Sequence, residues 1–341
     1  MLDRPLVAIA IVTYNSSRFI RQCLRYAFEQ DYHPLKIIAI DNASSDGTPD
    51  ILREFASRMQ TAYNLENTGF AAGQNQAIAL ANADWVLTLN PDVRLSPNFV
   101  SELVAAGQMD SSVGSVCGKL LAMSADFERP ASPVFDSTGI YFTPNLRHFD
   151  RGSREPDRHQ YERLEHVFGA TGAACLYRRE MIEDISVAGE FFDADFFAYR
   201  EDADVAWRAQ LRGWKCLYTP FAIAHHVRTV LPENRSALPA VINMHSVKNR
   251  WLLRIKNMTV DLYRRHWLSI TARDCVVIAA CLLREFRSLR AFVLLFRAWR
   301  RAWGKRCEIM RRRRASDDYL AAWFSWQPVS YPIPQGKMAS R

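Results

Sequence analysis

The sequence predicts an α/β fold in which a mostly parallel sheet carries helices on both faces. Three short runs, at Leu6–Val12, Lys36–Ile40 and Trp85–Leu89, have the length and the apolar content of strands buried on both sides. Between them, residues 17–29 and 70–82 repeat apolar side chains with helical spacing. Strands that alternate with helices in this way are typical of such a sheet.

Later segments extend the pattern less regularly. Thr48 is predicted to cap a helix that has Pro49 at its first position. Residues 124–165 are polar and Arg-rich, which predicts a long loop or insertion. Order returns at Val167–Tyr177, and a further helix is expected over 201–212.

Cysteine usage and the N-terminus bear on the compartment. The chain has seven cysteines among 341 residues and no Cys-x-x-Cys pair, which argues against a disulfide framework or a structural zinc site. The N-terminus lacks the layout of a secretory signal. The sequence also has no uninterrupted apolar run of about 18 residues, so we expect no membrane-spanning helix. We therefore expect a cytoplasmic protein.

The net charge of +8 is unevenly distributed. Residues 250–341 contain 20 Lys and Arg against 6 Asp and Glu, a net charge of +14, whereas the preceding residues have a net charge of −6. This asymmetry predicts an anionic partner for the basic C-terminal region, either a membrane surface or a nucleic acid.

Polar clusters follow the three predicted strands. They are Thr13-Tyr14-Asn15, Asp41-Asn42 and Asn90-Pro91-Asp92. Because ligands of parallel sheets bind beyond the carboxyl ends of the strands, the three clusters together predict a binding site. Asp92 at a strand end is suited to hold a divalent cation, or Asn90-Pro91-Asp92 is simply a turn. Asp41 either accepts a hydrogen bond from a base or ribose or belongs to a helix-capping turn.

Two later motifs carry titratable groups. Glu201-Asp202-Ala203-Asp204 either provides a general base or only favours the start of a helix. In His225-His226, one imidazole either completes a metal shell or is structural. The glycines of Gly69–Asn75 match neither the P-loop nor the dinucleotide fingerprint, which argues against a nicotinamide-dependent dehydrogenase.

In their order along the chain, these segments resemble family 2 glycosyltransferases, in particular the rhamnosyltransferase-like group of bacterial polysaccharide assembly. The resemblance covers about residues 5–250. It rests on the segments Val12–Ser16, Asp41–Thr48, Asn67–Asn75, Leu89–Asp92, Gly169–Ala173 and Tyr199–Asp204, and on His226.

The resemblance implies a GT-A fold, that is, a mixed or parallel nucleotide-binding sheet flanked by helices. Residues 1–250 would form the catalytic domain, with a nucleotide-binding half over 1–120 and an acceptor-binding half over 121–250. It further implies inverting transfer from a dTDP- or UDP-sugar, with rhamnose as the expected sugar, to a saccharide or lipid-linked acceptor.

The resemblance also assigns roles to individual residues. Thr13, Asn15 and Asp41 would line the nucleoside pocket. The other residues expected to bind the donor are Asn75 and Asn90. Asp92 and His226 would hold Mg²⁺ or Mn²⁺, and Asp202 would be the general base.

Residues 251–341 are predicted to form a basic amphipathic helical region. Its apolar stripe consists of Leu289, Phe292, Phe296, Trp299 and Trp303. Such a helix suits the interface of an anionic membrane, which predicts a peripheral protein on the inner face of the cell membrane. The alternative is a helix that packs on its own domain.

Two other functions remain in competition. A nucleic-acid-binding protein would use the Arg-rich C-terminal region, but the body shows no stacking platform or recognisable module, so we expect no nucleic acid partner. A nucleotidyltransferase would need a Gly-rich basic loop after the first strand, where this chain has Thr13–Arg18.

Overall fold

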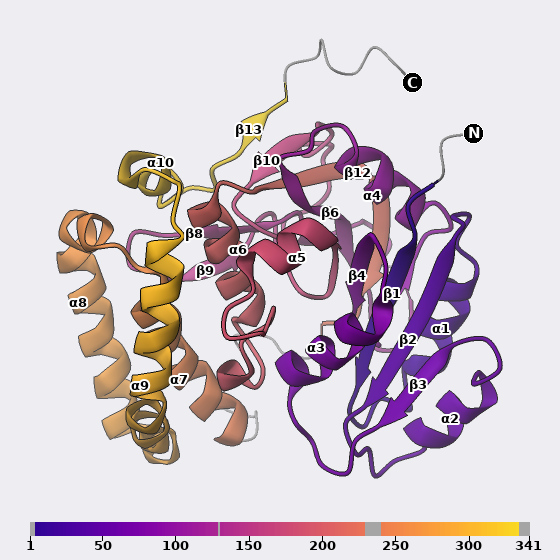
Figure 1. Cartoon of the computed structure of the whole chain (residues 1–341), viewed down its shortest axis with the longest axis horizontal. Helices are drawn as coiled ribbons and strands as arrows, with labels where there is room; N and C mark the ends of the chain where they lie inside the picture. Colours follow the sequence, from indigo (N-terminus) through magenta and orange to yellow (C-terminus); the bar gives the residue numbers. More distant parts are fainter. Residues whose placement is uncertain (1–3, 129, 229–239, 334–341) are drawn as a thin grey trace.

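The computed structural model describes residues 4–128, 130–228 and 240–333, and the predicted domains also include residues outside these ranges. A central mixed sheet runs through the molecule, and its strands lie in the order β13-β10-β12-β6-β11-β4-β1-β2-β3 (Figure 1). The predicted strands are confirmed to within one residue at most ends as β1 (Val7–Thr13), β2 (Leu35–Asp41) and β4 (Trp85–Leu89). The predicted α/β fold class is therefore confirmed.

The parallel part of the sheet aligns the polar clusters. β1 pairs in parallel with β2 and β4, and β2 pairs with β3 (Gln60–Tyr63). Thr13 stands directly opposite Asp41 in the β1–β2 register. The carboxyl ends of these strands therefore meet at one edge of the sheet.

The remaining strands make the sheet mixed. β11 (Ala174–Arg178) runs antiparallel between β4 and β6 (Val113–Ala122). β12 (Lys215–His226) pairs in parallel with β6 and antiparallel with β5 (Val93–Leu95). The β12–β5 pair brings the end of β12 next to the turn that follows β4.

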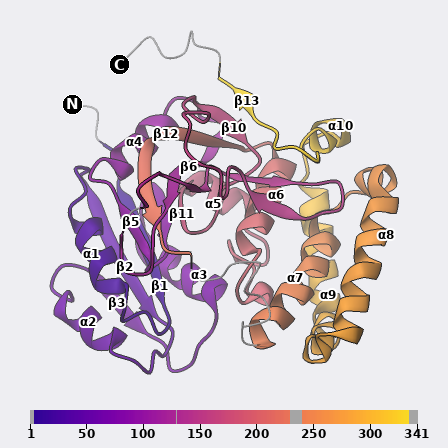
Figure 2. The same ribbon diagram turned by 180° about the vertical axis from the view of Figure 1, so that it is seen from behind.

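Helices cover both faces of the sheet (Figures 1 and 2). One face packs against α1 (Ile20–Phe28), α2 (Thr48–Glu54) and α4 (Phe99–Gly107). The other packs against α3 (Phe70–Ala81), α5 (Arg179–Ile185) and α6 (Glu201–Arg212). The side chains of β1 alternate between the two faces, and both faces are apolar and therefore need cover. Its odd-numbered residues enter one core, and its even-numbered residues enter the other.

One expectation about local structure is wrong, and another is incomplete. Thr48 is the first residue of α2 and not its cap; Gly47 takes the cap position, and the Asp46 carboxylate accepts the N–H of Thr48 at 3.0 Å. Residues 124–165 contain short strands. The sequence did not predict them, because three-residue strands are too short to show a period. They are β7 (Phe135–Ser137), β8 (Ile140–Phe142) and β9 (His148–Asp150), and β10 (Glu165–Val167) follows at the end of the segment.

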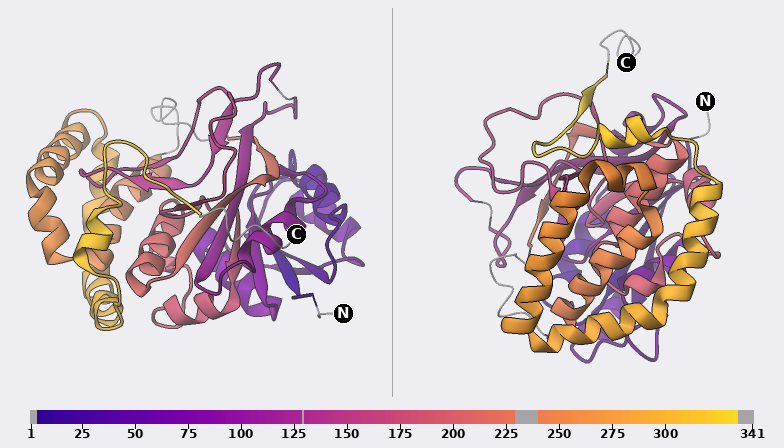
Figure 3. Two further views of the ribbon diagram at one scale, coloured as in Figure 1. Left: turned by 90° about the horizontal axis from the view of Figure 1, so that it is seen from above. Right: turned by 90° about the vertical axis from the view of Figure 1, so that its left-hand side faces the viewer.

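The C-terminal region forms a separate helical layer beside the sheet (Figure 3). It consists of α7 (Ala240–Asn257), α8 (Val260–Leu283), η3 (Phe286–Leu289), α9 (Arg290–Arg311) and α10 (Asp317–Ala321). The short β13 (Tyr331–Pro332) then returns to the sheet beside β10. The predicted boundary at residue 250 falls inside α7, so this helix belongs to both predicted parts.

The predicted apolar stripe, which runs from η3 into α9, divides. Leu289 and Phe292 pack into a small core, whereas Phe296, Trp299 and Trp303 are exposed. The helix α8 adds exposed Trp267 and Leu268. Within the described residues, the length and composition of α8 would allow it to cross a membrane. The sequence did not predict this, because charged residues interrupt the apolar run.

Candidate active site

The polar residues after β1 and β2 form one hydrogen-bonded unit. The buried Asp41 carboxylate accepts bonds from Thr13 Oγ1 at 2.8 Å and from the Ser44 N–H at 2.9 Å. Asn15, whose φ of 49° lies in the left-handed region, donates its N–H to Ser44 Oγ at 2.9 Å and accepts the Ser45 N–H at 2.8 Å. The structure therefore brings Thr13, Asn15 and Asp41 together, as expected.

Asn75 lies on α3, and the backbone of a distant segment engages its side chain. Its side-chain amide donates to the Phe192 carbonyl at 2.6 Å and accepts the Phe192 N–H at 2.9 Å. Both ends of the amide thus bind the protein itself. In this structure Asn75 ties α3 to the segment that precedes α6.

Asp92 and His226 meet at the end of β4. The Asp92 carboxylate lies 3.4 Å from Nε2 of the buried His226, and the Asp136 carboxylate lies 2.8 Å from its Nδ1. His226 stands opposite Val93 in the β12–β5 register, which places it, rather than His225, against Asp92. Burial lowers the pKa of His226, but Asp136 and Asp92 outweigh it and raise this pKa to about 10.

These donors fit a divalent cation. A carboxylate oxygen and an imidazole nitrogen are ligands that Mn²⁺ accepts, and a carboxylate on the other ring nitrogen is the usual support of a metal-binding histidine. With Asp136 on Nδ1, the Nε2 atom of His226 faces Asp92. A metal at Nε2 would have to displace a proton from this imidazole.

The sequence did not single out three residues of this cluster, namely Asp136, Asp150 and Arg228. The Arg228 guanidinium lies 2.8 Å from the Asp136 carboxylate and 2.7 Å from the Asp150 carboxylate. Burial raises the pKa of Asp136, but His226 and Arg228 outweigh it and lower this pKa. Asp136 and Asp150 stand on the short strands within residues 124–165, and no spacing signal marked them.

The three acids at the start of α6 have different surroundings. The Asp202 carboxylate accepts the N–H of Gly172 at 3.0 Å and of Ala203 at 2.7 Å. Burial raises the pKa of Asp202, and the nearby Asp150 carboxylate raises it further. Glu201 is buried, and burial followed by the charge of Asp202 raises its pKa well above the ordinary value.

Asp204 has a structural role. Its buried carboxylate contacts Arg208 at 2.8 Å, Lys256 at 2.9 Å and the side-chain amide of Asn257 at 2.7 Å. Burial raises the pKa of Asp204, but Lys256 and Arg208 outweigh it and lower this pKa. Asp204 therefore stays charged to bind α7, which leaves Asp202 as the partly exposed acid of the three.

Neighbouring residues join Asp202 to the turn after β4. Gly172 donates to Asp202, and the next residue, Ala173, accepts the Asn90 N–H at 2.8 Å. The Gly172 carbonyl also accepts a bond from Thr88 Oγ1 at 3.2 Å. The predicted base and the predicted metal turn are thus fixed to one two-residue segment at the same edge of the sheet.

A strained loop precedes Asp202. Phe197, Tyr199 and Arg200 have φ values of 66°, 69° and 73°, each in a region that costs a residue other than glycine about 1–3 kcal/mol. Asn249 of α7 supports this loop, because its side-chain amide donates to the carbonyls of Phe196, Ala198 and Tyr199. Backbone strain of this kind gathers at functional sites.

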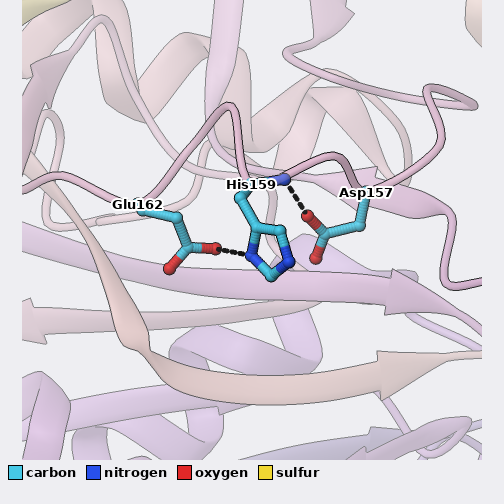
Figure 4. A group of neighbouring side chains, drawn as sticks. All are labelled: Asp157, His159 and Glu162. Atoms are coloured by element: carbon cyan, nitrogen blue, oxygen red, sulfur yellow. Dashed lines mark hydrogen bonds and ion pairs between the residues drawn. The ribbon is translucent and has the colours of Figure 1, made fainter.

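A second acidic group stands away from these residues. Asp157, His159 and Glu162 have side-chain ligand atoms within 4.8 Å of one another (Figure 4). The Lys119 ammonium lies 2.5 Å from the Glu162 carboxylate and 3.6 Å from that of Asp157. The side chain of His159 is 85% exposed. The lysine therefore already pairs with both carboxylates of this group, and we assign the group no metal.

Comparison with known proteins agrees with the fold. The sequence profile described as "Glycosyl transferase family 2" matches residues 8–186. The chain is 26% identical over 241 residues to N-acetylglucosaminyl-diphospho-decaprenol L-rhamnosyltransferase of Mycobacterium tuberculosis (strain H37Rv), which covers 65% of this chain and 75% of that protein.

Two solved structures share the fold. GalNAc-T7, solved with UDP, GalNAc and Mn²⁺, has a TM-score of 0.60 at 13% identity, over 75% of this chain and 48% of that one. The mannosyltransferase PcManGT from Pyrobaculum calidifontis, solved with GDP-Man and Mn²⁺, has a TM-score of 0.51 at 16% identity, over 91% and 86%.

The sheet order and these likenesses define a glycosyltransferase of the GT-A type. Because the profile covers more than half of the chain, the chain belongs to Glycosyl transferase family 2, and it is similar to the rhamnosyltransferase-like group. The nucleic-acid-binding and nucleotidyltransferase alternatives are not favoured.

Proposed function

We propose that this chain transfers a sugar, with inversion, from a nucleotide diphosphate sugar to a saccharide or lipid-linked acceptor in cell-surface polysaccharide synthesis. A dTDP- or UDP-sugar is the proposed donor, and the similarity to a rhamnosyltransferase supports rhamnose as its sugar. The observation that carries the proposal is the Gly172–Ala173 segment, which bonds both Asp202 and the Asn90 turn.

Asp202 is the proposed general base. Its two backbone N–H donors fix the carboxylate, and its raised pKa makes it a stronger proton acceptor than an ordinary aspartate. It would take the proton of the acceptor hydroxyl while that oxygen attacks the anomeric carbon. A single displacement of this kind inverts the anomeric centre.

The donor would lie across the strand ends. Thr13, Asn15 and Asp41 would contact the nucleoside, and Asn90 would face the diphosphate sugar. Asp92 and His226 would hold Mg²⁺ or Mn²⁺. When bound, such a cation neutralises the negative charge that develops on a departing diphosphate.

A membrane surface is the proposed partner of the helical layer. The exposed aromatic residues Phe296, Trp299 and Trp303 lie on a helix that also exposes Arg297 and Arg300, a combination suited to the interface of an anionic bilayer. Arg273 and Asp274 stand in the middle of α8, where each would cost about 2.5–3.5 kcal/mol at the centre of a bilayer. We therefore propose a peripheral protein on the inner, cytoplasmic face.

A thermal-shift screen tests the donor site. dTDP, UDP and their sugars should raise the melting temperature of the full chain when Mn²⁺ or Mg²⁺ is present, because these ligands bind the native state. Asp92→Ala should abolish the metal-dependent part of this shift. Asp157→Ala, which removes a carboxylate from the separate acidic group, should leave it intact. An unchanged shift in Asp92→Ala would remove Asp92 from the metal shell.

A further inference from the structure

The turn of the β8–β9 hairpin is held between two helices of the C-terminal layer. Arg250 of α7 donates to the Asn145 carbonyl at 3.2 Å, and Ser269 of α8 donates to the Pro144 carbonyl at 3.2 Å. Figure 2 shows the hairpin reaching toward α8. The turn, α7 and α8 therefore form one junction.

Arginines outnumber carboxylates at this junction. Arg250 and Arg254 share the single carboxylate of Asp274, at 3.2 and 2.5 Å. Arg147 belongs to the hairpin turn, and Arg273 lies four residues after Ser269, on the side of α8 that faces the turn. Four guanidinium groups thus stand near one carboxylate.

Arg147 and Arg273 have no anionic partner among the described residues. Arg147 rests over the ring of Phe149, 4.4 Å from its centroid. The Nε atom of Arg273 is buried without a hydrogen-bond acceptor in the described part of the chain. Burial lowers the pKa of Arg147, and the nearby charge of Arg273 lowers it further.

This arrangement favours an anionic ligand. A buried guanidinium N–H without an acceptor loses its hydration without compensation, and two like charges at close range repel. A phosphate group relieves both costs, because its oxygens accept paired bonds from guanidinium groups.

The junction also lies between the candidate active site and the exposed apolar side of α8. Strand β9 follows Arg147 directly; its His148 ring contacts Arg200 at 3.1 Å, and its Asp150 contacts Arg228 at 2.7 Å. Three residues of extended chain, about 10 Å, thus separate Arg147 from Asp150. On α8, Val276 is 56% exposed one turn beyond Arg273.

We propose that Arg147 and Arg273 bind the diphosphate group of a lipid-linked acceptor. This inference rests on the proposed function, since it names the acceptor class of the same site. The acceptor saccharide would extend along β9 toward Asp202, and its lipid would lie along the exposed face of α8.

Binding of farnesyl diphosphate to the full chain, without nucleotide or metal, tests the proposal independently of turnover. We expect Arg147→Gln/Arg273→Gln to weaken this binding at least roughly tenfold, because each lost guanidinium removes a charge-assisted bond. The matched variant Arg25→Gln/Arg58→Gln removes the same charge from two exposed positions outside the C-terminal layer and should bind as the wild type does. Farnesol, which lacks the diphosphate, should bind weakly to all three proteins.

Two outcomes would overturn the proposal. The first is equal affinity for farnesyl diphosphate in the wild type and in Arg147→Gln/Arg273→Gln; if this variant also no longer sediments with phosphatidylglycerol vesicles, the arginines bind a lipid headgroup instead. The second is an equal loss in both double variants, which would indicate nonspecific attraction. An unchanged unfolding midpoint shows that each variant is folded.

Discussion

The two sides of helix α9 use the same kinds of basic residue differently. On the inner side, Lys305 lies 2.6 Å from the Asp193 carboxylate and 3.2 Å from that of Glu190. On the outer side, Arg297 and Arg300 are exposed and have no ion pair among the described residues. The outer side also carries the exposed aromatic residues Phe296, Trp299 and Trp303.

The difference teaches that the net charge of +14 of residues 250–341 has two destinations. Part of it neutralises acids of the catalytic body: Lys256 contacts both Asp193 and Asp204, and Arg301 contacts Asp195. Other cations of this region, among them Arg297 and Arg300, are exposed without an ion pair among the described residues and are available for an external anion. Packing on the domain, the alternative that the sequence left open, holds for the inner side, and the membrane contact is our proposal for the outer side.

The largest expected effect comes from removing Lys256, which lies on α7 and, like Lys305 on the inner side of α9, contacts Asp193. Lys256→Met leaves the buried carboxylates of Asp193 and Asp204 without their shared cation, and we expect it to lower the free energy of unfolding by about 3–5 kcal/mol. Arg300→Met on the outer side should change it by less than about 0.5 kcal/mol. Urea denaturation of both variants measures the contrast, and equal losses would contradict it.

A second variant, also on α7, weakens the contact between the helical layer and the loop before α6 without removing charge. Asn249→Ala deprives the carbonyls of Phe196, Ala198 and Tyr199 of their donor, which should cost about 1–3 kcal/mol of unfolding free energy. Because this loop leads into Asp202, transfer should fall while nucleotide binding persists. Normal transfer by the folded variant would show that the strained loop needs no support from α7.

Substitutions on the outer side of α9 should weaken membrane binding without changing the free energy of unfolding. Arg297→Gln/Arg300→Gln should weaken sedimentation on anionic vesicles, since each arginine near the surface contributes about 1 kcal/mol. Trp299→Ala/Trp303→Ala should remove the part of the binding that high salt does not reverse. If neither double variant changes sedimentation, the outer side is not the membrane contact.

The smallest expected effect is a difference between the pH dependence of sugar transfer and that of vesicle binding. Asp202 acts only as the carboxylate, so its raised pKa predicts that transfer falls as the pH drops through a value above the ordinary 3.8. Vesicle binding through arginines should stay constant between about pH 5 and 8, because these groups remain charged. A shared pH profile for transfer and vesicle binding would contradict this separation.

The sequence predicts the regular parts of this molecule better than its insertion. β1, β2, β4 and α6 are long enough to show buried runs or helical spacing, and the polar groups at their ends follow from the topology of a parallel sheet. Asp136 and Asp150 escaped prediction because they stand on three-residue strands, which carry no period. Their importance appears only when β7 and β9 fold back toward His226 and Arg228.

Burial also separates residues that look alike in the sequence. Nothing in Glu201-Asp202-Ala203-Asp204 shows that Asp204 binds Lys256, because that contact spans 52 residues. The engagement of Asn75 by Phe192 spans 117 residues and is equally invisible. Sequence order can place polar residues at an edge, but only the packing of distant elements shows which of them the protein itself already engages.

The rate of sugar transfer by Asp202→Asn tests the central claim most directly. The substitution keeps the size of the side chain but removes the proton acceptor, so we expect donor binding near that of the wild type and a loss of transfer of at least about 10²-fold. Glu201→Gln is the matched control: burial raises the pKa of Glu201 well above its ordinary value, and the amide keeps the size of this buried side chain, so the variant should retain most of the activity. Near-normal transfer by Asp202→Asn, with a large loss in Glu201→Gln, would contradict the assignment of Asp202 as the base.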